Sequence, residues 1–376
     1  MNKSVFWFVL FLSISPSRLV NAQNLIPKAD HIVVAILENH SYTQIIGSKD
    51  APYINSLAND TLSALFTNSY AVTHPSQPNY LILYSGSTQG VTDDLIPSEI
   101  PFATANLGRQ LIDAGKTFIT YSEDLESVGF NGSSSGDYAR KHNPAANWMG
   151  TGLNQVPTTT NQPFTAFPSD NFALLPTISF VVPNLIHDMH DGADPARITT
   201  GDDWISHNLD RYIQWAKTHN CLFILTFDEG LTADKNRILT IITGQMVKAG
   251  QYSDKITHYS ILHTLESIYG LPMVGDSLSY KPISFCWKAG EFSSISPANN
   301  ANDLIYPNPC REWLNIKISN YQNAIAEIYT MEGQLIWKNT LASTNTPINT
   351  EALVKGAYLL KITRREGITV FKFLKS

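Results

Sequence analysis

Two uninterrupted apolar runs constrain the fold of this chain more than any other feature of its sequence. Residues 32–37 (Ile-Val-Val-Ala-Ile-Leu) and residues 221–227 (Cys-Leu-Phe-Ile-Leu-Thr-Phe) contain no charged side chain. Runs of this length, composed largely of β-branched and other large apolar residues, are typical of strands buried on both faces, as in a parallel sheet. We therefore expect both runs to lie in the interior of such a sheet.

Further strands and helices alternate along the same part of the chain. Short apolar runs at residues 118–123, 178–182 and 238–242 predict additional strands. Residues 204–218 and 257–269 have apolar side chains at helical spacing, and the first of these helices is expected to start after Asp202 and Asp203. This alternation indicates an α/β layered fold.

Length and charge limit the classes of function. The chain has 376 residues, of which 43% are hydrophobic, and a formal net charge of −6. This is enough chain for one large core and a small second domain. No basic stripe or RNA-binding motif is present, so nucleic-acid binding is not expected. Of the three cysteines, Cys221 is expected to be buried, whereas a bridge between Cys286 and Cys310 is left open.

The N-terminus is typical of an export signal. Lys3 precedes an apolar stretch at residues 5–12, and Val20-Asn21-Ala22 is an acceptable cleavage site. The apolar stretch is too short to be a membrane anchor, and no later segment reaches transmembrane length. We predict a signal peptide over residues 1–22, followed by a catalytic domain over residues 23–292.

The C-terminal part has a different character. A polar linker at residues 293–302 precedes short alternating runs separated by turns, which predict a small antiparallel β-sandwich over residues 303–376. The residues alone leave two interpretations of this sandwich open, a carbohydrate-binding module and an inert tail.

Particular segments of the sandwich resemble the C-terminal sorting domain of type IX secretion substrates. They are residues 306–309 (Tyr-Pro-Asn-Pro), 331–333 (Met-Glu-Gly), 355–358 (Lys-Gly-Ala-Tyr) and the basic ending 371–376. The resemblance implies an export address, with the type IX secretion machinery as partner. It also implies a secreted or cell-surface protein that is exported through the periplasm.

Oxygen-bearing side chains follow both of the strongest predicted strands. Glu38 and Asn39 come directly after the first, and Asp228 and Glu229 directly after the second. Open α/β sheets bind their ligands at the carboxyl ends of strands. Clustered carboxylates repel one another unless a cation neutralises them, so a divalent metal is one explanation. Two independent solvated strand ends are the other.

The stretch at residues 73–80 (Thr-His-Pro-Ser-Gln-Pro-Asn-Tyr) is expected to lead into a short helix over residues 78–85 that stops at Gly86. Ser76 then lies at or just before the helix N-terminus, where free N–H groups favour an anion. A serine there is either a helix cap or a nucleophile that holds a phosphoryl group.

Two loops add histidines. Residues 183–192 include His187, Asp188, His190 and Asp191, a density that suits a second metal or phosphate contacts, unless the loop is a polar surface loop. Residues 138–144 carry His142 among basic neighbours, as either a flap over an anionic substrate or an exposed basic turn.

Several of these segments together resemble the phosphoesterase family of bacterial acid phosphatases and phosphatidylcholine-type phospholipases C, within the alkaline phosphatase superfamily. The resemblance spans about residues 30–272 and implies a doubly wound, mostly parallel α/β sheet with helices on both faces. The matching segments are, in order, residues 38–42, 51–55, 74–80, 141–144, 187–191 and 227–229.

The resemblance also assigns roles to residues. Ser76 takes the place of the nucleophile next to a metal, and His142 and His190 that of groups contacting the phosphoryl group or protonating the leaving oxygen. The implied metal ligands are Glu38, Asn39, Asp228 and Glu229. The implied substrate-binding residues are His74, Asn79, His187 and Asp188, with Asn79 contacting a phosphate oxygen.

The oxygen-rich ligand set favours one hard cation such as Ca²⁺, Mg²⁺ or Mn²⁺, with Zn²⁺ as the remaining option. A second metal involving Asp188 and His190 is left open. The favoured function is a secreted phosphomonoesterase working through a phosphoserine. The alternatives are a phospholipase C and a non-catalytic surface protein that binds a glycan. The presence of Ser76 and all four expected ligands argues against the last.

Overall fold

The computed structural model describes residues 26–275, 279–288, 303–319, 321–322, 324–330, 334–364 and 367–376. The predicted signal peptide, the predicted linker and the Met-Glu-Gly segment at residues 331–333 lie outside the described residues. Within the described ranges, no helix combines the length and apolar character needed to cross a lipid bilayer.

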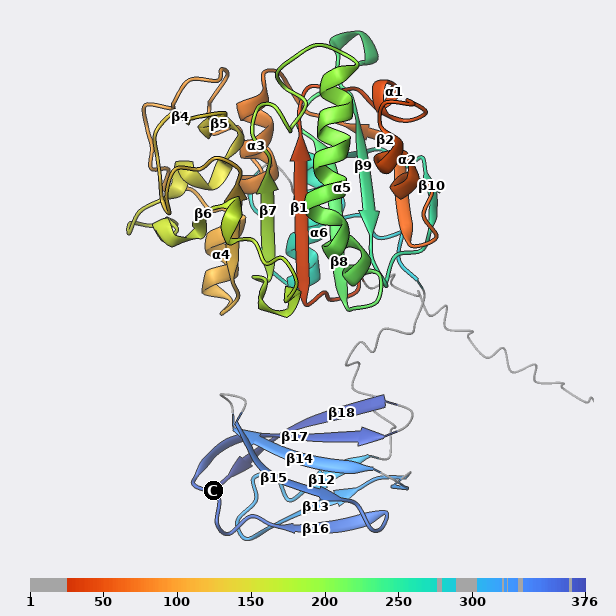
Figure 1. Ribbon diagram of the computed structural model, residues 1–376. Coiled ribbons are helices and arrows are strands. Elements are labelled where there is room, and N and C mark those ends of the chain that lie inside the picture. The colour runs from red at the N-terminus through yellow and green to blue at the C-terminus, as the bar shows by residue number, and fades with distance from the viewer. Residues whose placement is uncertain are drawn as a thin grey trace, which may run out of the picture.

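A nine-stranded sheet forms the centre of the first part of the chain (Figure 1). Its strands run in the order β10-β2-β9-β8-β1-β7-β3-β6, and β11 also pairs with β2. β9 is antiparallel to both neighbours, whereas the other described pairs are parallel. The mostly parallel sheet predicted from the sequence is confirmed. The strands are β1 (His31–Leu37), β2 (Ser63–Tyr70), β3 (Phe118–Ser122), β6 (Asn161–Pro163), β7 (Ile178–Val182), β8 (Cys221–Phe227), β9 (Arg237–Thr243), β10 (Gly250–Tyr252) and β11 (Ile256–Thr257).

Helices cover both faces of this sheet. Alternate residues of β1 belong to two separate cores, with Ile32 and Val34 in one and Val33 and Ala35 in the other. This two-sided burial is why residues 32–37 of β1 have no polar side chain. The first core is completed by α3 (Ser76–Ser85), α4 (Leu107–Asp113) and α6 (His258–Tyr269), and the second by α1 (Tyr42–Ile45), α2 (Pro52–Ala58) and α5 (Ala196–Ala216).

Two helices begin earlier than the sequence predicts. α3 begins at Ser76, with Pro75 as its N-cap, and all ten of its residues are buried. α5 begins at Ala196 instead of after Asp203. Asp202, inside α5, accepts hydrogen bonds from the backbone N–H groups of Tyr53 (2.9 Å) and Ile54 (2.7 Å) in the first turn of α2. The capping signal at Asp202 therefore serves a different helix.

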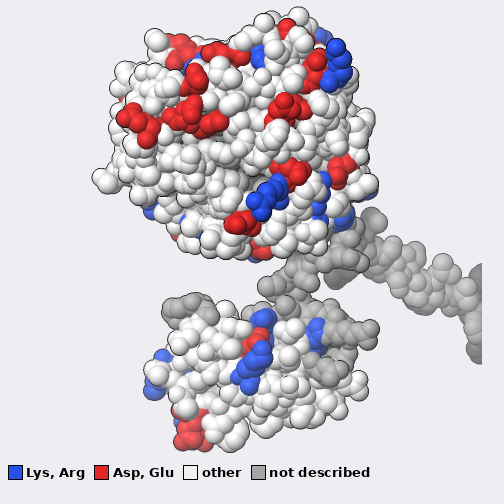
Figure 2. Space-filling model, in the orientation of Figure 1, with Lys and Arg blue, Asp and Glu red and all other residues white. Residues whose placement is uncertain are grey.

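Charged side chains are unevenly distributed over the surface. In the view of Figure 2, acidic side chains gather along the upper end of the first part of the chain, the end toward which β1 points in Figure 1. Lysine and arginine side chains are scattered on this face as small separate groups.

The C-terminal part consists of two antiparallel sheets around a core of its own. One sheet has the order β12-β13-β16 and the other β15-β14-β17-β18. Side chains of both sheets, such as Leu314 and Leu360, form one core cluster, which confirms the predicted small β-sandwich. The described cysteines are all free and buried, so Cys286 and Cys310 are not bridged. The strands are β12 (Leu304–Tyr306), β13 (Trp313–Lys317), β14 (Ile325–Thr330), β15 (Leu335–Thr340), β16 (Asn345–Asn349), β17 (Gly356–Arg364) and β18 (Gly367–Lys375).

Glu266 in α6 provides a test of the packing of the first core. Its Oε1 accepts a hydrogen bond from the backbone N–H of Val274 at 3.1 Å, whereas Oε2 has no hydrogen-bond partner in the described part of the chain. Burial raises the pKa of Glu266 to about 8, although the Val274 N–H favours the charged form. The folded protein thus keeps a proton that the unfolded chain releases near pH 4.5.

The stability of the protein should therefore fall as the pH rises from about 4.5 to about 8, because the folded state binds the extra proton across that window. Glu266→Gln, which is neutral throughout, should unfold at a higher temperature than wild type at pH 8 and at nearly the same temperature at pH 5. Thermal unfolding at both pH values measures this. A difference of equal size at both would attribute the effect to packing instead of to titration.

Candidate functional site

The ends of β1 and β8 bring the predicted acidic residues together. The two strands are adjacent and parallel, so Glu38-Asn39 and Asp228-Glu229 lie at the same edge of the sheet. The backbone N–H of Asn39 donates to Asp228 Oδ1 at 3.0 Å. Asn39 has a left-handed backbone (φ 53°), a conformation that asparagine tolerates better than most residues. The chain can therefore turn sharply at the strand end while the carboxylates stay close.

Glu38 is the centre of the site. Its side chain is fully buried, and Ser76 Oγ donates to its Oε2 at 3.0 Å. Tyr80, one turn further along α3, donates to Oε1 at 2.6 Å, and the Asn39 side chain donates to Oε2 at 3.1 Å. His142 Nε2 lies 3.3 Å from Oε1. Residues from three segments, Asn39, α3 and His142, thus converge on one carboxylate.

Three buried carboxylates lie close enough to interact. Burial and the charges of Asp228 and Asp188 raise the pKa of Glu38 well above its ordinary value. Burial, together with Glu229, raises the pKa of Asp228 to about 7, and burial raises that of Asp188. Within the described residues, neither lysine nor arginine forms an ion pair with any of the three. Such a group binds a proton or a metal cation readily.

Two histidines lie beside this group, each with a carboxylate at its Nδ1 atom. The Nδ1 atom of His142 lies 3.0 Å from Asp188 Oδ2, and that of His190 lies 2.6 Å from Asp191 Oδ1. A carboxylate at Nδ1 orients the ring and leaves Nε2 as the ligand atom, as at many metal sites. His142 Nε2 is buried and makes no hydrogen bond to any described residue, although Glu38 Oε1 lies 3.3 Å away. Burial lowers the pKa of His142, which favours the neutral ring that binds metals.

Ligand atoms of Glu38, His142 and His190 all lie within 4.8 Å of one another. We call these three residues the metal triad. One carboxylate oxygen and two imidazole nitrogens form a donor set that suits a divalent transition metal or Zn²⁺. The residues present therefore fit a divalent metal ion.

The metal triad shares only one member with the four ligands expected from the sequence. Glu38 is common to both sets, whereas Asn39 donates hydrogen bonds to Glu38 and Asp228. Glu229 accepts a hydrogen bond from His74 Nδ1 at 2.7 Å, and burial raises its pKa to about 7. Asp228 Oδ2 has no hydrogen-bond partner in the described chain. All four expected residues lie at this edge, and Asp228 keeps an oxygen atom free.

The side-chain amide of Asn79, which is expected to contact a phosphate oxygen, makes hydrogen bonds within the chain. Its Oδ1 accepts from the backbone N–H groups of Val72 and Thr73, each at 3.1 Å. Its Nδ2 donates to the Thr73 carbonyl at 2.8 Å. These bonds occupy the amide, so Asn79 shapes the loop that leads to Ser76. We regard it as a positioning residue.

The loop at residues 183–192 separates its two histidines. His187 Nδ1 makes a hydrogen bond with Glu123 Oε2 at 2.9 Å, and the His187 ring stacks on that of Trp204. Neither partner belongs to the group of residues around Glu38. Asp188 faces the site but contacts His142, which it orients. Both of these expected substrate-binding residues thus make hydrogen bonds to other side chains of the protein.

Sequence reasoning assigned no role to Tyr80 or Asp94. Tyr80 lies four residues after Ser76 and therefore on the same face of α3, which is a signal that helical spacing provides. Asp94 accepts hydrogen bonds from the backbone N–H of Gln77 (3.0 Å) and from the ammonium group of Lys141 (3.1 Å). It lies in no recognisable sequence motif. Lys141 also lies 3.2 Å from His190 Nε2, a contact that a metal at His190 would displace.

Comparison with known proteins gives this arrangement a context. Residues 47–272 match the sequence profile of the Phosphoesterase family. The chain belongs to the phosphoesterase family. It is a phosphoric ester hydrolase, as the resemblance of its motifs implied. Residues 304–376 of this phosphoesterase match the Secretion system C-terminal sorting domain, which marks a secreted or cell-surface protein.

Relatives of this phosphoesterase carry phosphatase names. It is 44% identical over 267 residues to Phosphatidylinositol-3-phosphatase of Mycobacterium tuberculosis, a match that covers 71% of this chain and 85% of that protein. It is 30% identical over 253 residues to Acid phosphatase of Aspergillus fumigatus, with 64% and 54% covered. The chain thus spans about half the length of this fungal relative. A solved structure from Vibrio parahaemolyticus, described as a protein in the alkaline phosphatase superfamily, has a TM-score of 0.47 and 12% sequence identity to this chain. The match covers 93% of this chain and 80% of that one.

The metal triad can be tested with two histidines only three residues apart. Replacing even an outer partner of a metal ligand costs about 10–100-fold in affinity, so His190→Ala should weaken metal binding by at least about tenfold. His187→Ala, outside the triad, should retain the metal. Elemental analysis of both variants after dialysis against a defined metal buffer measures this. Equal metal content in the two variants would remove His190 from the site.

Proposed function

We infer that the protein is a secreted, metal-dependent phosphomonoesterase in which Ser76 is phosphorylated transiently. The observation that carries this proposal is the hydrogen bond of the Ser76 hydroxyl to Glu38 Oε2 at 3.0 Å, next to the metal triad. The sorting domain supports export, for which we propose a route through the periplasm.

A helix-cap role for Ser76 has less support. Pro75 is the N-cap of α3, and no side chain makes a capping hydrogen bond there. The Ser76 hydroxyl is directed at a buried carboxylate instead of at a backbone N–H. A hydroxyl whose proton is held by an acceptor of raised pKa is suited to act as a nucleophile.

The phosphatase names of the two relatives favour a monoesterase over a phospholipase C. One of those names specifies a phosphorylated inositol lipid, and the other an acid phosphatase.

The reaction proceeds in two displacements. Ser76 Oγ bonds to phosphorus as the bond from phosphorus to the alcohol oxygen breaks, and the alcohol leaves with a proton. Water then attacks phosphorus, the phosphorus–Oγ bond breaks, and Ser76 regains its proton. A divalent ion held by the metal triad would lower the pKa of the serine hydroxyl and screen the negative charge of the substrate.

The surrounding side chains divide the remaining tasks. Glu38 orients the Ser76 hydroxyl, and Tyr80 fixes Glu38 through its 2.6 Å hydrogen bond. Lys141 supplies positive charge for the phosphate oxygens, held by Asp94. His74, whose side chain is 41% exposed to solvent and is bonded to Glu229, is the side chain to which we assign proton donation to the leaving oxygen.

Ser76→Ala tests the proposal directly. Turnover of p-nitrophenyl phosphate should fall by at least about a thousandfold, because no covalent intermediate can form. Ser85→Ala, at the other end of the same buried helix, is the matched control and should remain active. Ser85 Oγ donates to the backbone carbonyls of Leu81 and Ser87 and accepts from the Gln89 side chain, none of which contacts Glu38. Thermal unfolding and metal content establish that both variants are folded.

Acid quenching of the wild type with a labelled phosphomonoester should place the label on the peptide that contains Ser76. Label on another peptide, or near-normal turnover by Ser76→Ala, would assign the nucleophile elsewhere. Release of phosphocholine from phosphatidylcholine without release of free phosphate would favour the phospholipase C reading.

The C-terminal sandwich has a hydrophobic core separate from those of the first part of the chain, which predicts separable roles for the two parts. The sandwich has its own hydrophobic core, so a truncated protein of residues 23–298 should fold and retain the kcat/KM of the full chain. In the native host, it should fail to reach the cell exterior. A soluble, monomeric but inactive truncated protein would show that the C-terminal part contributes to the reaction.

A further inference from the structure

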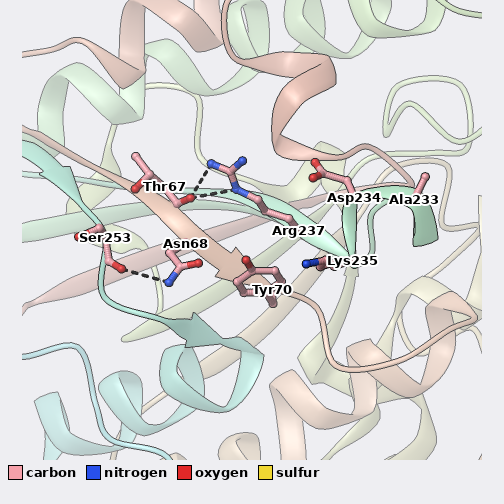
Figure 3. Close-up of a pocket in the computed structure, with 8 residues that line it drawn as sticks. All are labelled: Thr67, Asn68, Tyr70, Ala233, Asp234, Lys235, Arg237 and Ser253. Carbon is pink, nitrogen blue, oxygen red and sulfur yellow. Dashed lines mark hydrogen bonds between the residues drawn. The ribbon is translucent and has the colours of Figure 1, made fainter.

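A hollow of about 500 Å³, whose lining residues are drawn in Figure 3, lies beside β2 and β9. Strand directions place it at the same edge of the sheet as the proposed reaction centre. β2 and β8 are both antiparallel to β9, so the end of β2 at Tyr70 faces the same way as the end of β8. Two strand spacings separate β2 from β8, which places the hollow on the order of 10 Å from Asp228. None of the residues around Glu38 lines it. It is lined by Thr67, Asn68, Tyr70, Ala233, Asp234, Lys235, Arg237 and Ser253.

A β-bulge forms one side of the hollow. The register between β2 and β9 shifts between Phe66 and Ser69, so Thr67 and Asn68 leave the regular ladder. The carbonyl of Thr67 then accepts two hydrogen bonds from Arg237, from Nε at 2.9 Å and from Nη2 at 2.6 Å (Figure 3). Bulges often redirect side chains beside active sites. Here the bulge fixes the guanidinium group in one orientation.

The hollow has an excess of positive charge. The Arg237 guanidinium lies 4.1 Å from the centre of the Tyr42 ring, and within the described residues neither Arg237 nor Lys235 forms an ion pair with a carboxylate. Asp234, the one acidic lining residue, accepts a hydrogen bond from Thr43 Oγ1 at 3.1 Å. An arginine held rigidly and without a counter-ion is suited to bind phosphate or carboxylate oxygens.

Hydrogen bonds connect the side of the hollow formed by residues 233–237 to the loop before Ser76. Asn236 lies between the two basic residues, and its Nδ2 donates to the carbonyl of Thr73 at 2.9 Å. Its carbonyl accepts the N–H of Ala71 at 2.9 Å, and its Oδ1 accepts the N–H of Gly230 at 2.7 Å. Asn236 thus connects the segment that carries Lys235 and Arg237 to the loop before Ser76. It also connects that segment to Gly230, which directly follows Asp228 and Glu229. A ligand that spans the hollow and the reaction centre would therefore contact segments that are hydrogen-bonded to one another.

We propose that this hollow binds a second anionic group of the substrate. Resting on the proposed phosphomonoesterase function, the inference is that the enzyme prefers phosphomonoesters whose alcohol carries a further phosphate or carboxylate on the order of 10 Å from the scissile phosphorus. Arg237 and Lys235 contact that distal group, while Ser76 attacks the other end of the molecule.

The test compares fructose 1,6-bisphosphate with fructose 6-phosphate. Lys235→Asn removes the charge and retains a residue that tolerates the left-handed backbone at this position (φ 56°). The ratio of kcat/KM for the bisphosphate to that for the monophosphate should fall by about tenfold, the scale of one charge-assisted hydrogen bond. Lys116→Gln, which removes a lysine stacked on Tyr269 before β3, is the matched control and should leave the ratio unchanged.

Arg237→Gln serves as a second variant, and thermal unfolding shows whether it keeps its fold. An unchanged ratio in folded Lys235→Asn, or an equal loss with both substrates, overturns the proposal.

Calorimetry separates this proposal from the proposed function. In the Ser76→Ala background, binding of fructose 1,6-bisphosphate should weaken by about tenfold when Lys235→Asn is added, whether or not the wild type turns over either substrate. If the wild type hydrolyses neither compound but binding still depends on Lys235, the anion site stands and the phosphomonoesterase proposal fails. Binding that does not depend on Lys235 or Arg237 rejects the anion site.

Discussion

The burial of the Glu38 carboxylate is the constraint on which the rest of the site depends. An ionised carboxylate removed from water loses several kcal/mol of solvation, and two further buried carboxylates, Asp188 and Asp228, add repulsion. Hydrogen bonds from Ser76 and Tyr80 offset part of this cost. The remainder requires positive charge at this edge of the sheet. This excess of buried negative charge is the physical basis of the cation site that we propose beside Ser76.

The central strands and their ends could be predicted from the sequence because their signals are local. Residues 32–37 and 221–227 are buried on both faces, and burial on both faces leaves an uninterrupted apolar run. β2 gave no such signal. Its Ser63 and Ser69 bond to the hydroxyls of Thr243 and Thr240 at 2.7 and 2.8 Å, so polar residues are buried in pairs across the sheet. A pairing of this kind cannot be seen in either segment alone.

The orientation of the histidines illustrates what spacing does not determine. His187 and His190 lie in one loop, and both were expected to act on the phosphoryl group. Glu123, at the end of another strand, binds the first, whereas Asp191 orients the second toward Glu38. The identity of each partner depends on how distant segments pack. The motif predicts which residue types gather, and the tertiary contacts decide which of them can react.

The complete burial of α3 has a consequence for how this enzyme can change over evolution. Every residue of the helix that begins with Ser76 is packed against other parts of the protein, so the helix has no free surface on which substitutions accumulate harmlessly. The proposed nucleophile, Ser76, is therefore held nearly invariant in position. Diversification of substrate preference must instead occur in the more exposed segments around the rim, such as residues 231–237, where a new side chain alters recognition without moving the reacting oxygen.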